Sequence, residues 1–297
     1  MSNKPRKMTL EKKHNLTGWA FLAPATFLIA VFSFWPMIKA LVLSFQTGKG
    51  RNMQMAGFTN YIRMFQDDVF IQSIKNTFFY FILQVPIMLV VAMVLACILN
   101  KKDLRFKGFF RTMIFVPCTT SLVAYSIIFR SLFANNGLVN YVLVNIGILD
   151  KPYNFLTQPF AAKMVIILGL LWRWTGYNMV FFLSGLQNIE YSVYEAAKID
   201  GASAIQTFFK ITVPLLKPTI LLTAIMSTNG TLQLFDESIN LTDGGPANAS
   251  ISMSHYIYNL CFKYVPNFGY AAAMSFFILL LVAVLAFIQM RVGDKRD

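Results

Sequence analysis

Residues 76–99 read NTFFYFILQVPIMLVVAMVLACIL, and no charged side chain interrupts them. An α-helix rises about 1.5 Å per residue, so about 20 apolar residues are needed to cross the hydrocarbon core of a bilayer. Strands that span a membrane are shorter and alternate in polarity, which this stretch does not do. We therefore predict a transmembrane helix over residues 73–99.

Five further stretches have a similar length and apolar character. The first is not interpreted as a signal peptide, because its apolar run is too long and no A-x-A cleavage site follows it. Together the stretches predict an all-α integral membrane protein with six transmembrane helices in a single domain, residues 1–297. These helices are predicted at about residues 18–45, 73–99, 109–133, 161–186, 218–241 and 267–290.

The composition agrees with a membrane protein. Of the 297 residues, 56% are hydrophobic and 13% are charged, whereas a soluble globular domain carries about 25% charged residues. This excludes a disordered chain, a coiled coil and a disulfide scaffold, and it argues against a soluble enzyme. The cysteines Cys97, Cys118 and Cys261 lie far apart without metal-ligand spacing, so no metal or other cofactor is expected.

The distribution of basic residues predicts the orientation. The chain has 26 Lys and Arg against 13 Asp and Glu, for a net charge of +13. Sixteen of the basic residues lie in the termini and in the loops after the second and fourth spans, and six lie in the opposite loops. Lys and Arg concentrate on the cytoplasmic side of membrane proteins. We therefore expect both termini in the cytoplasm, and the charge excess requires no nucleic-acid partner.

The long cytoplasmic loop at residues 188–217 carries helical signals of its own. Residues 195–202 read EAAKIDGA, in which Glu195 to Lys198 are good helix formers and Gly201 can end the helix in the left-handed conformation. A second short helix is predicted from Ala202 to Ile211. Two short helices joined at a glycine would make a compact knob on the membrane surface. An ordinary amphipathic connector is the alternative interpretation.

The same loop carries a family resemblance. Glu195-Ala196-Ala197, followed at fixed spacing by Gly201, Ile211 and Pro214, resembles the EAA loop of permease subunits in binding-protein-dependent ABC importers. Val213 departs mildly from the Leu that usually precedes the proline. Phe235-Asp236 and the LTDGGP at 241–246 resemble the signature of the carbohydrate-uptake branch, of the maltose and glycerol-phosphate permease type. Flanking pieces agree, so the resemblance covers nearly the whole chain: FWP at 34–36, WTGYN at 174–178 and GYAAAMS at 269–275.

The resemblance implies the permease fold of type I ABC importers, in a bacterial or archaeal cell membrane. Such a permease is not an enzyme, and no G-x-x-x-x-G-K-[ST] motif of an ATP-binding loop occurs in the chain. The energy would therefore come from a separate subunit. The implied partners are a second, homologous permease in a heterodimer, a cytoplasmic ATPase dimer, an extracytoplasmic sugar-binding protein, and a sugar or oligosaccharide.

The EAA loop is similar to the coupling helix that docks in a cleft of the ATPase. In that role Glu195 would pair with a basic residue of the ATPase, and Gly201 would make the turn. Ala196 and Ala197 would permit close approach, and Asp200 belongs to the same segment. The plainer interpretation of Glu195 is a solvated carboxylate on a surface helix.

Arg173 is the ionisable side chain nearest the middle of a predicted span, about 18 Å from its start. Lys39 and Arg130 lie near span ends, where long side chains extend to the interface. Maltose-type permeases contact sugar through the helices equivalent to the fourth and fifth spans. By helical spacing, two faces on these spans form the predicted substrate path: Arg173, Trp174 and Tyr177 on the fourth, and Ser227, Gly230, Thr231 and Leu234 on the fifth.

The chemistry of this path has two open alternatives. Arg173 could bind an anionic sugar, or it could pair with Asp236 or Glu237. The aromatic side chains of Trp174 and Tyr177 could stack on sugar rings, or they could serve helix packing. The sequence does not specify the sugar.

Two other functions compete with sugar import by an ABC permease. An ion-coupled secondary transporter would be favoured by inverted repeats and buried acidic relays, and neither is evident. A membrane enzyme would need a convergent catalytic cluster. The two histidines, His14 and His255, have no partner pattern of that kind.

Overall fold

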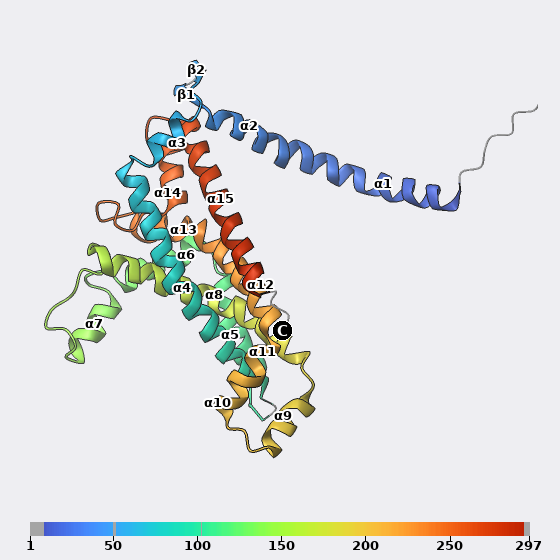
Figure 1. The fold of residues 1–297 in the computed structure, drawn as a ribbon. Coiled ribbons are helices and arrows are strands. Elements are labelled where there is room, and N and C mark those ends of the chain that lie inside the picture. The colour runs from blue at the N-terminus through green and yellow to red at the C-terminus, as the bar shows by residue number, and fades with distance from the viewer. Residues whose placement is uncertain (1–8, 50–51, 102, 294–297) are drawn as a thin grey trace, which may run out of the picture.

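Three long helices form the body of the computed structural model, which describes residues 9–49, 52–101 and 103–293 (Figure 1). Each is long and apolar enough to cross a bilayer. They are α4 (Asp68–Asn100), α8 (Pro159–Gln187) and α15 (Phe268–Gly293). Seven of the basic residues used to predict the orientation lie outside the described residues: Lys4, Arg6, Lys7, Arg51, Lys102, Lys295 and Arg296.

Two pairs of consecutive helices are sharply bent; the first lies within the predicted span 109–133, and the second bends just before the predicted span 218–241. The helices α5 (Lys107–Thr119) and α6 (Leu122–Leu132) meet at 98°, and residues 204–215 meet α12 (Lys217–Leu232) at 72°. The described residues therefore contain four helices that could span a membrane, or up to six spans if each bent pair is counted as one.

The bend between α5 and α6 differs from the single helix predicted at 109–133. Pro117 lies in the last turn of α5 and has no backbone N–H to donate to the helical ladder. Thr120, directly after α5, is extended. The fifth span also ends earlier than predicted, because α12 stops at Leu232 and a new helix, α13 (Asp236–Thr242), begins after a short break.

Small side chains bring the body helices close together. In α4, Ala92 and Ala96 lie one turn apart and are fully buried against Phe182 of α8 and its neighbours. Gly176 of α8 lies so close to α5 that a Cβ atom there would overlap the carbonyl oxygen of Ile114. Close approach at small residues is the usual basis of helix packing in membranes.

Shorter elements occupy the two ends of the body (Figure 1). One end, here called the hairpin end, carries an antiparallel hairpin that the all-α prediction did not anticipate. The elements at or towards this end are β1 (Gln46–Lys49), β2 (Asn52–Met55), α3 (Thr59–Met64), α14 (Met253–Tyr258) and a π-helical turn (Asn259–Lys263), while α7 (Leu138–Asn145) projects sideways. The opposite end carries α9 (Tyr191–Ile199), α10 (Ala204–Thr207), a π-helical turn (Phe208–Thr212) and α11 (Val213–Leu215).

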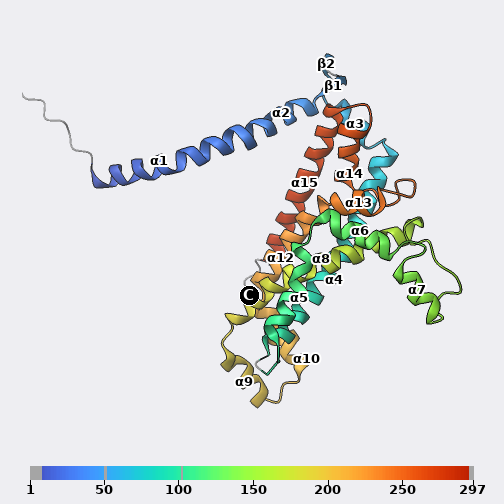
Figure 2. The ribbon, with the colours of Figure 1, turned by 180° about the vertical axis from the view of Figure 1, so that it is seen from behind.

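The N-terminal helices form a rod that leaves the body, as Figures 1 and 2 both show. The rod consists of α1 (Leu10–Ile29), a π-helical turn (Ala30–Phe34) and α2 (Trp35–Ser44). Only its last part touches the rest of the described chain, where α2 meets α15 and β1. None of its apolar window is buried inside the chain.

Candidate functional site

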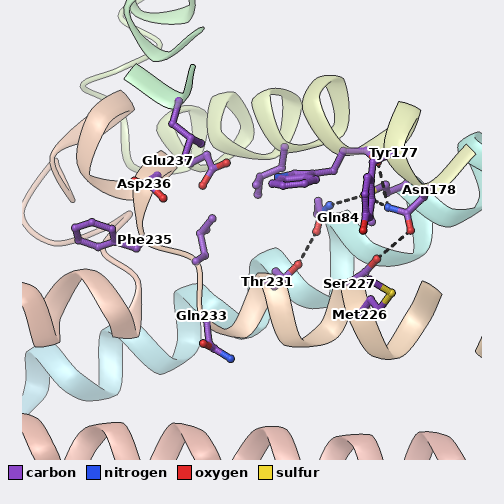
Figure 3. A pocket seen from close by; sticks show the side chains of 16 residues that line it. Gln84, Tyr177, Asn178, Met226, Ser227, Thr231, Gln233, Phe235, Asp236 and Glu237 are labelled. Atoms are coloured by element: carbon purple, nitrogen blue, oxygen red, sulfur yellow. Dashed lines mark hydrogen bonds between the residues drawn. The ribbon is translucent and has the colours of Figure 1, made fainter. Parts of the chain in front are cut away.

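A pocket of about 370 Å³ lies beside the middle of α8, where α4, α8 and α12 converge with the start of α13 (Figure 3). We call it the central pocket. Its lining combines aromatic, hydroxyl, amide and apolar side chains: Gln84, Met88, Leu122, Leu170, Trp174, Tyr177, Asn178, Met226, Ser227, Gly230, Thr231, Gln233, Leu234, Phe235, Asp236 and Glu237.

The structure brings most of the predicted substrate-path residues to this pocket. Six of the seven line it, from both of the predicted helices. The end of the helix α12 at Leu232 contributes to this arrangement. Because the chain leaves the helix there, Leu234 and its neighbours can turn towards the pocket. The six residues are Trp174, Tyr177, Ser227, Gly230, Thr231 and Leu234.

Arg173 is the exception, because its guanidinium is bound elsewhere. Its Nη1 donates to the carbonyl oxygen of Thr120 at 2.8 Å, and its Nη2 donates to that of Cys118 at 3.5 Å. These carbonyls lie at the bend between α5 and α6. The guanidinium also lies over the rings of Tyr125 and Trp174, at 5.2 and 5.3 Å from their centroids. Arg173 therefore satisfies backbone groups that the helix break leaves without helical partners.

The position of Arg173 fits neither of the two contacts considered from the sequence, which were with a sugar in the substrate path and with Asp236 or Glu237. Among the described residues, no ion pair joins Arg173 to Asp236 or Glu237. Arg173 is 6% exposed and is absent from the pocket lining. The sequence could not indicate this arrangement, because the acceptors are backbone carbonyls, which every residue has.

The sequence reasoning missed the contribution of α4. Gln84 and Met88 line the central pocket from this helix. A signal was present, since Gln84 carries the one amide side chain between Phe78 and Ile98. A polar side chain in the middle of an apolar span is costly unless it has a partner, so it marks a contact inside the protein.

Hydrogen bonds connect the polar side chains of the pocket across three helices (Figure 3). The hydroxyl of Thr231 donates to Oε1 of Gln84 at 3.0 Å, and the hydroxyl of Ser227 donates to Oδ1 of Asn178 at 3.3 Å. Trp174 and Tyr177 stand edge to face, with ring centroids 5.8 Å apart. The acidic residues of the lining are Asp236 and Glu237.

The loop directly after the segment that resembles the carbohydrate-branch signature lies against α4. The side-chain amide of Asn76 donates to the carbonyl oxygen of Ile251 at 2.9 Å, and the Tyr80 hydroxyl donates to that of Ser250 at 3.0 Å. Asp243 and Gly244, at the turn itself, both have positive φ angles. These contacts secure the turn that follows the pocket-lining start of α13.

The predicted coupling residues lie at the opposite end of the molecule from the hairpin. Glu195, Ala196 and Ala197 lie in α9, which ends next to Asp200, and Gly201 follows with a φ of +75°. Their exposure differs, because Ala197 is buried whereas the other four are exposed. The helix end is closed by a bond from the Ala202 N–H to the carbonyl oxygen of Ala197 at 2.9 Å. Exposed apolar side chains surround this motif, including Ile199, Ile205 and Phe209.

Comparison with known proteins places these features in a family. Residues 68–296 match the model of the binding-protein-dependent transport system inner membrane component. The chain is 51% identical over 292 residues to the lactose transport system permease protein LacF of Rhizobium radiobacter, with 98% of each chain covered. It is 31% identical to the arabinooligosaccharides transport system permease protein AraP of Halalkalibacterium halodurans, covering 96% of this chain and 90% of that one.

A solved structure has the same fold. It is a chain of the bacterial alginate ABC transporter in complex with an alginate pentasaccharide-bound periplasmic protein. The TM-score is 0.84 at 25% sequence identity, with 98% of both chains covered. The likeness thus extends over the N-terminal rod as well as the body.

Proposed function

Because the chain belongs to the family of binding-protein-dependent transport system inner membrane components, we propose that it is the permease subunit through which an ABC importer takes up a neutral disaccharide or short oligosaccharide. Membership of a transport family supports transport rather than membrane enzymology, and dependence on a binding protein supports an ABC importer rather than an ion-coupled transporter. The chain would switch between outward and inward access as ATP acts on a separate subunit, which is a population shift between two conformations.

The observation that carries the neutral assignment is the charge of the central pocket. Its acidic lining residues are Asp236 and Glu237, while the nearby cation, Arg173, is bound to the carbonyl oxygens of Thr120 and Cys118. A carboxylated sugar would face the carboxylate of Asp236 and the buried carboxyl group of Glu237 in a site of low dielectric, which is unfavourable. Hydroxyl, amide and aromatic groups suit a neutral sugar. LacF, the relative that shares 51% identity, is named for lactose, a neutral disaccharide.

The exposed end of α9 supports a role in coupling to the ATPase. Glu195 and Gly201 are exposed there, and Ile199 has 85% of its surface free. Apolar side chains so exposed beside a charged one are typical of a protein interface. We propose that this end is cytoplasmic, together with both termini, and that Glu195 pairs with a basic residue of the ATPase. Replacing Glu195 with Lys, or Gly201 with Val, should reduce co-purification of the ATPase subunit.

The N-terminal rod supports the proposed pairing with a second permease. Its apolar window has no buried residue, although the chain's other spanning helices are partly buried. Phe21, Phe27 and Phe32 are more than half exposed. A homologous permease beside the rod would cover part of this surface. The alginate transporter structure includes an alginate pentasaccharide-bound periplasmic protein, and by analogy a binding protein would deliver sugar to this chain at the hairpin end.

Uptake by the reconstituted complex tests the proposal. Vesicles containing this chain, its partner permease and the ATPase would be given the cognate binding protein and a panel of neutral disaccharides and uronates. We expect ATP-dependent uptake of a neutral sugar and none of the uronates. Uptake of uronates only, or sugar uptake that is independent of ATP, would contradict the proposal.

A further inference from the structure

Two buried amides of the central pocket, Gln84 on α4 and Asn178 on α8, share one acceptor. Gln84 is 1% exposed and Asn178 is 3% exposed. Nε2 of Gln84 donates to the sulfur of Met88 at 3.0 Å, and Nδ2 of Asn178 donates to the same sulfur at 3.5 Å. The two amides thus point their nitrogen atoms at the same place from two different helices.

The thioether is a poor match for these donors. A methionine sulfur is a weak acceptor, and a buried N–H without a good partner is costly. The oxygen atoms of both amides, by contrast, accept from hydroxyls, those of Thr231 and Ser227. Nδ2 of Asn178 also donates to the carbonyl oxygen of Trp174 at 3.1 Å. Each amide is therefore well satisfied at its oxygen and directs one N–H at the weak thioether acceptor, on the wall of a pocket that also contains Trp174 and Tyr177.

We propose that Gln84 and Asn178 are specificity-determining residues, whose amide N–H groups recognise hydroxyl oxygens of the sugar, and that α4 thereby forms a third wall of the binding site. Met88 holds these donors when sugar is absent. The inference rests on the sugar uptake proposed above, and it adds residues outside the two helix faces that the sequence indicated. A sugar hydroxyl is a stronger acceptor than the thioether, so binding would improve the pairing of both amides.

Amide recognition of a hydroxyl has a distinct consequence for selectivity. A buried site that hydrogen-bonds a hydroxyl rejects an analogue without it, because the site's own polar group is then left unpaired. A residue that only supports packing affects every analogue equally. The two roles can therefore be separated with sugars that lack single hydroxyls.

The experiment measures ATP-dependent uptake of the transported disaccharide and of its monodeoxy analogues, in the reconstituted complex with one binding protein. Because every variant uses the same binding protein, its own selectivity cancels in the comparison. We expect at least one monodeoxy analogue to be taken up about tenfold less efficiently than the parent sugar by the unmodified complex. The ratio of parent-sugar uptake to analogue uptake should fall to about one in Gln84→Leu. The same should hold in Asn178→Leu for an analogue that lacks a different hydroxyl.

Three further variants complete the design. Gln72→Leu makes the same change in α4, outside the pocket lining, and should keep the ratio. Met88→Leu removes the sulfur and should also keep it. Gln84→Met keeps the length of the side chain and loses the donor, so it should abolish the ratio even if Gln84→Leu fails to assemble.

The inference is overturned if the pocket variants reduce uptake of the parent sugar and of all analogues by the same factor. That result is distinct from failure of the proposed function, which would appear as an absence of ATP-dependent sugar uptake in the unmodified complex.

Discussion

A comparison of α8 with the N-terminal rod contradicts the expectation that the more apolar of two spans is the more deeply buried. The best window of α8 has a mean hydropathy of 1.3, and 61% of it is buried inside the chain. The N-terminal helix, from Leu10 to Ser44, reaches 1.9, yet none of its window is buried. In a membrane the surroundings of a helix are themselves apolar, so hydropathy does not measure burial in protein.

This difference in hydropathy and burial follows from where the polar residues of the two segments lie. In α8, Arg173 and Asn178 are each buried against polar partners from other helices. In the rod, the exposed surface is made of side chains such as Phe21 and Phe32. The lower hydropathy of α8 thus marks the helix that contacts the pocket and the rest of the protein.

The largest expected difference in stability comes from adding a methyl group to one glycine of α8 and to one glycine of α1, in separate variants. Gly176→Ala in α8 would place a Cβ atom against the backbone of Ile114, which cannot move as a flexible side chain would. We expect a loss of about 3 kcal/mol or more in the free energy of unfolding. Gly18→Ala in α1 meets nothing within 4 Å, and it should be neutral or slightly stabilising, because alanine favours a helix.

Thermal unfolding of the purified complex, together with the amount of chain in the membrane, would measure this contrast. Equal tolerance of both substitutions would mean that α5 and α8 are not packed as closely as described.

A smaller effect on stability is expected from removing the charge of an arginine, and its size should differ between a buried and an exposed arginine. Arg173→Ala leaves the carbonyl oxygens of Thr120 and Cys118 without their donor, and should cost about 2 kcal/mol of stability and impair uptake. Arg130→Ala, on the exposed surface of α6, should change stability by less than about 0.5 kcal/mol. Unchanged uptake by Arg173→Ala in the intact complex would rule out its role at the bend.

The smallest expected effect on stability comes from changing the residue that caps the start of a helix, which differs between α4 in the body and α1 in the rod. Asp67 accepts from the Val69 and Phe70 N–H groups at the start of α4, and from the Tyr256 and Tyr270 hydroxyls. Thr9, at the start of α1, makes no such side-chain bond. Asp67→Asn keeps a good helix cap but weakens the tyrosine bonds, so we expect a loss of about 1 kcal/mol.

Asp67 also predicts a dependence on pH. Burial opposes its ionisation, but the hydrogen bonds outweigh burial and lower its pKa below the ordinary value of 3.8. Its stabilisation is therefore complete above that value and is lost as pH falls through the lowered pKa. Unfolding midpoints measured down to about pH 3 should fall less steeply for Asp67→Asn than for the unmodified protein. Parallel pH profiles would contradict this.

The apolar spans and the two pocket faces could be predicted from sequence because both follow from spacing along a helix. The bend after Pro117 could not. Pro24 and Pro86 lie inside α1 and α4 without ending them, so a proline in a span indicates a break only when its neighbours allow one. The two paired strands at residues 46–49 and 52–55 are short and lack clear alternation, which leaves no periodic signal.

The partners of Arg173 were beyond sequence reasoning, since a freed backbone carbonyl has no residue type of its own. Gln84 was within reach, because one amide in an apolar span requires a partner. Its pairing with Thr231, 147 positions away, depends on how α4 and α12 pack.

The bond between Arg173 and the bend has a consequence for how the chain enters the membrane during synthesis. On insertion scales an arginine at a helix centre costs about 2.5–3.5 kcal/mol. Cys118 and Thr120 precede Arg173 in the chain, so their carbonyl oxygens are synthesised before the guanidinium leaves the ribosome. An α5–α6 segment that has already left the translocon can therefore offer these carbonyl oxygens when α8 enters the membrane. The hydrogen-bond acceptors of Arg173 are thus synthesised before the arginine that uses them.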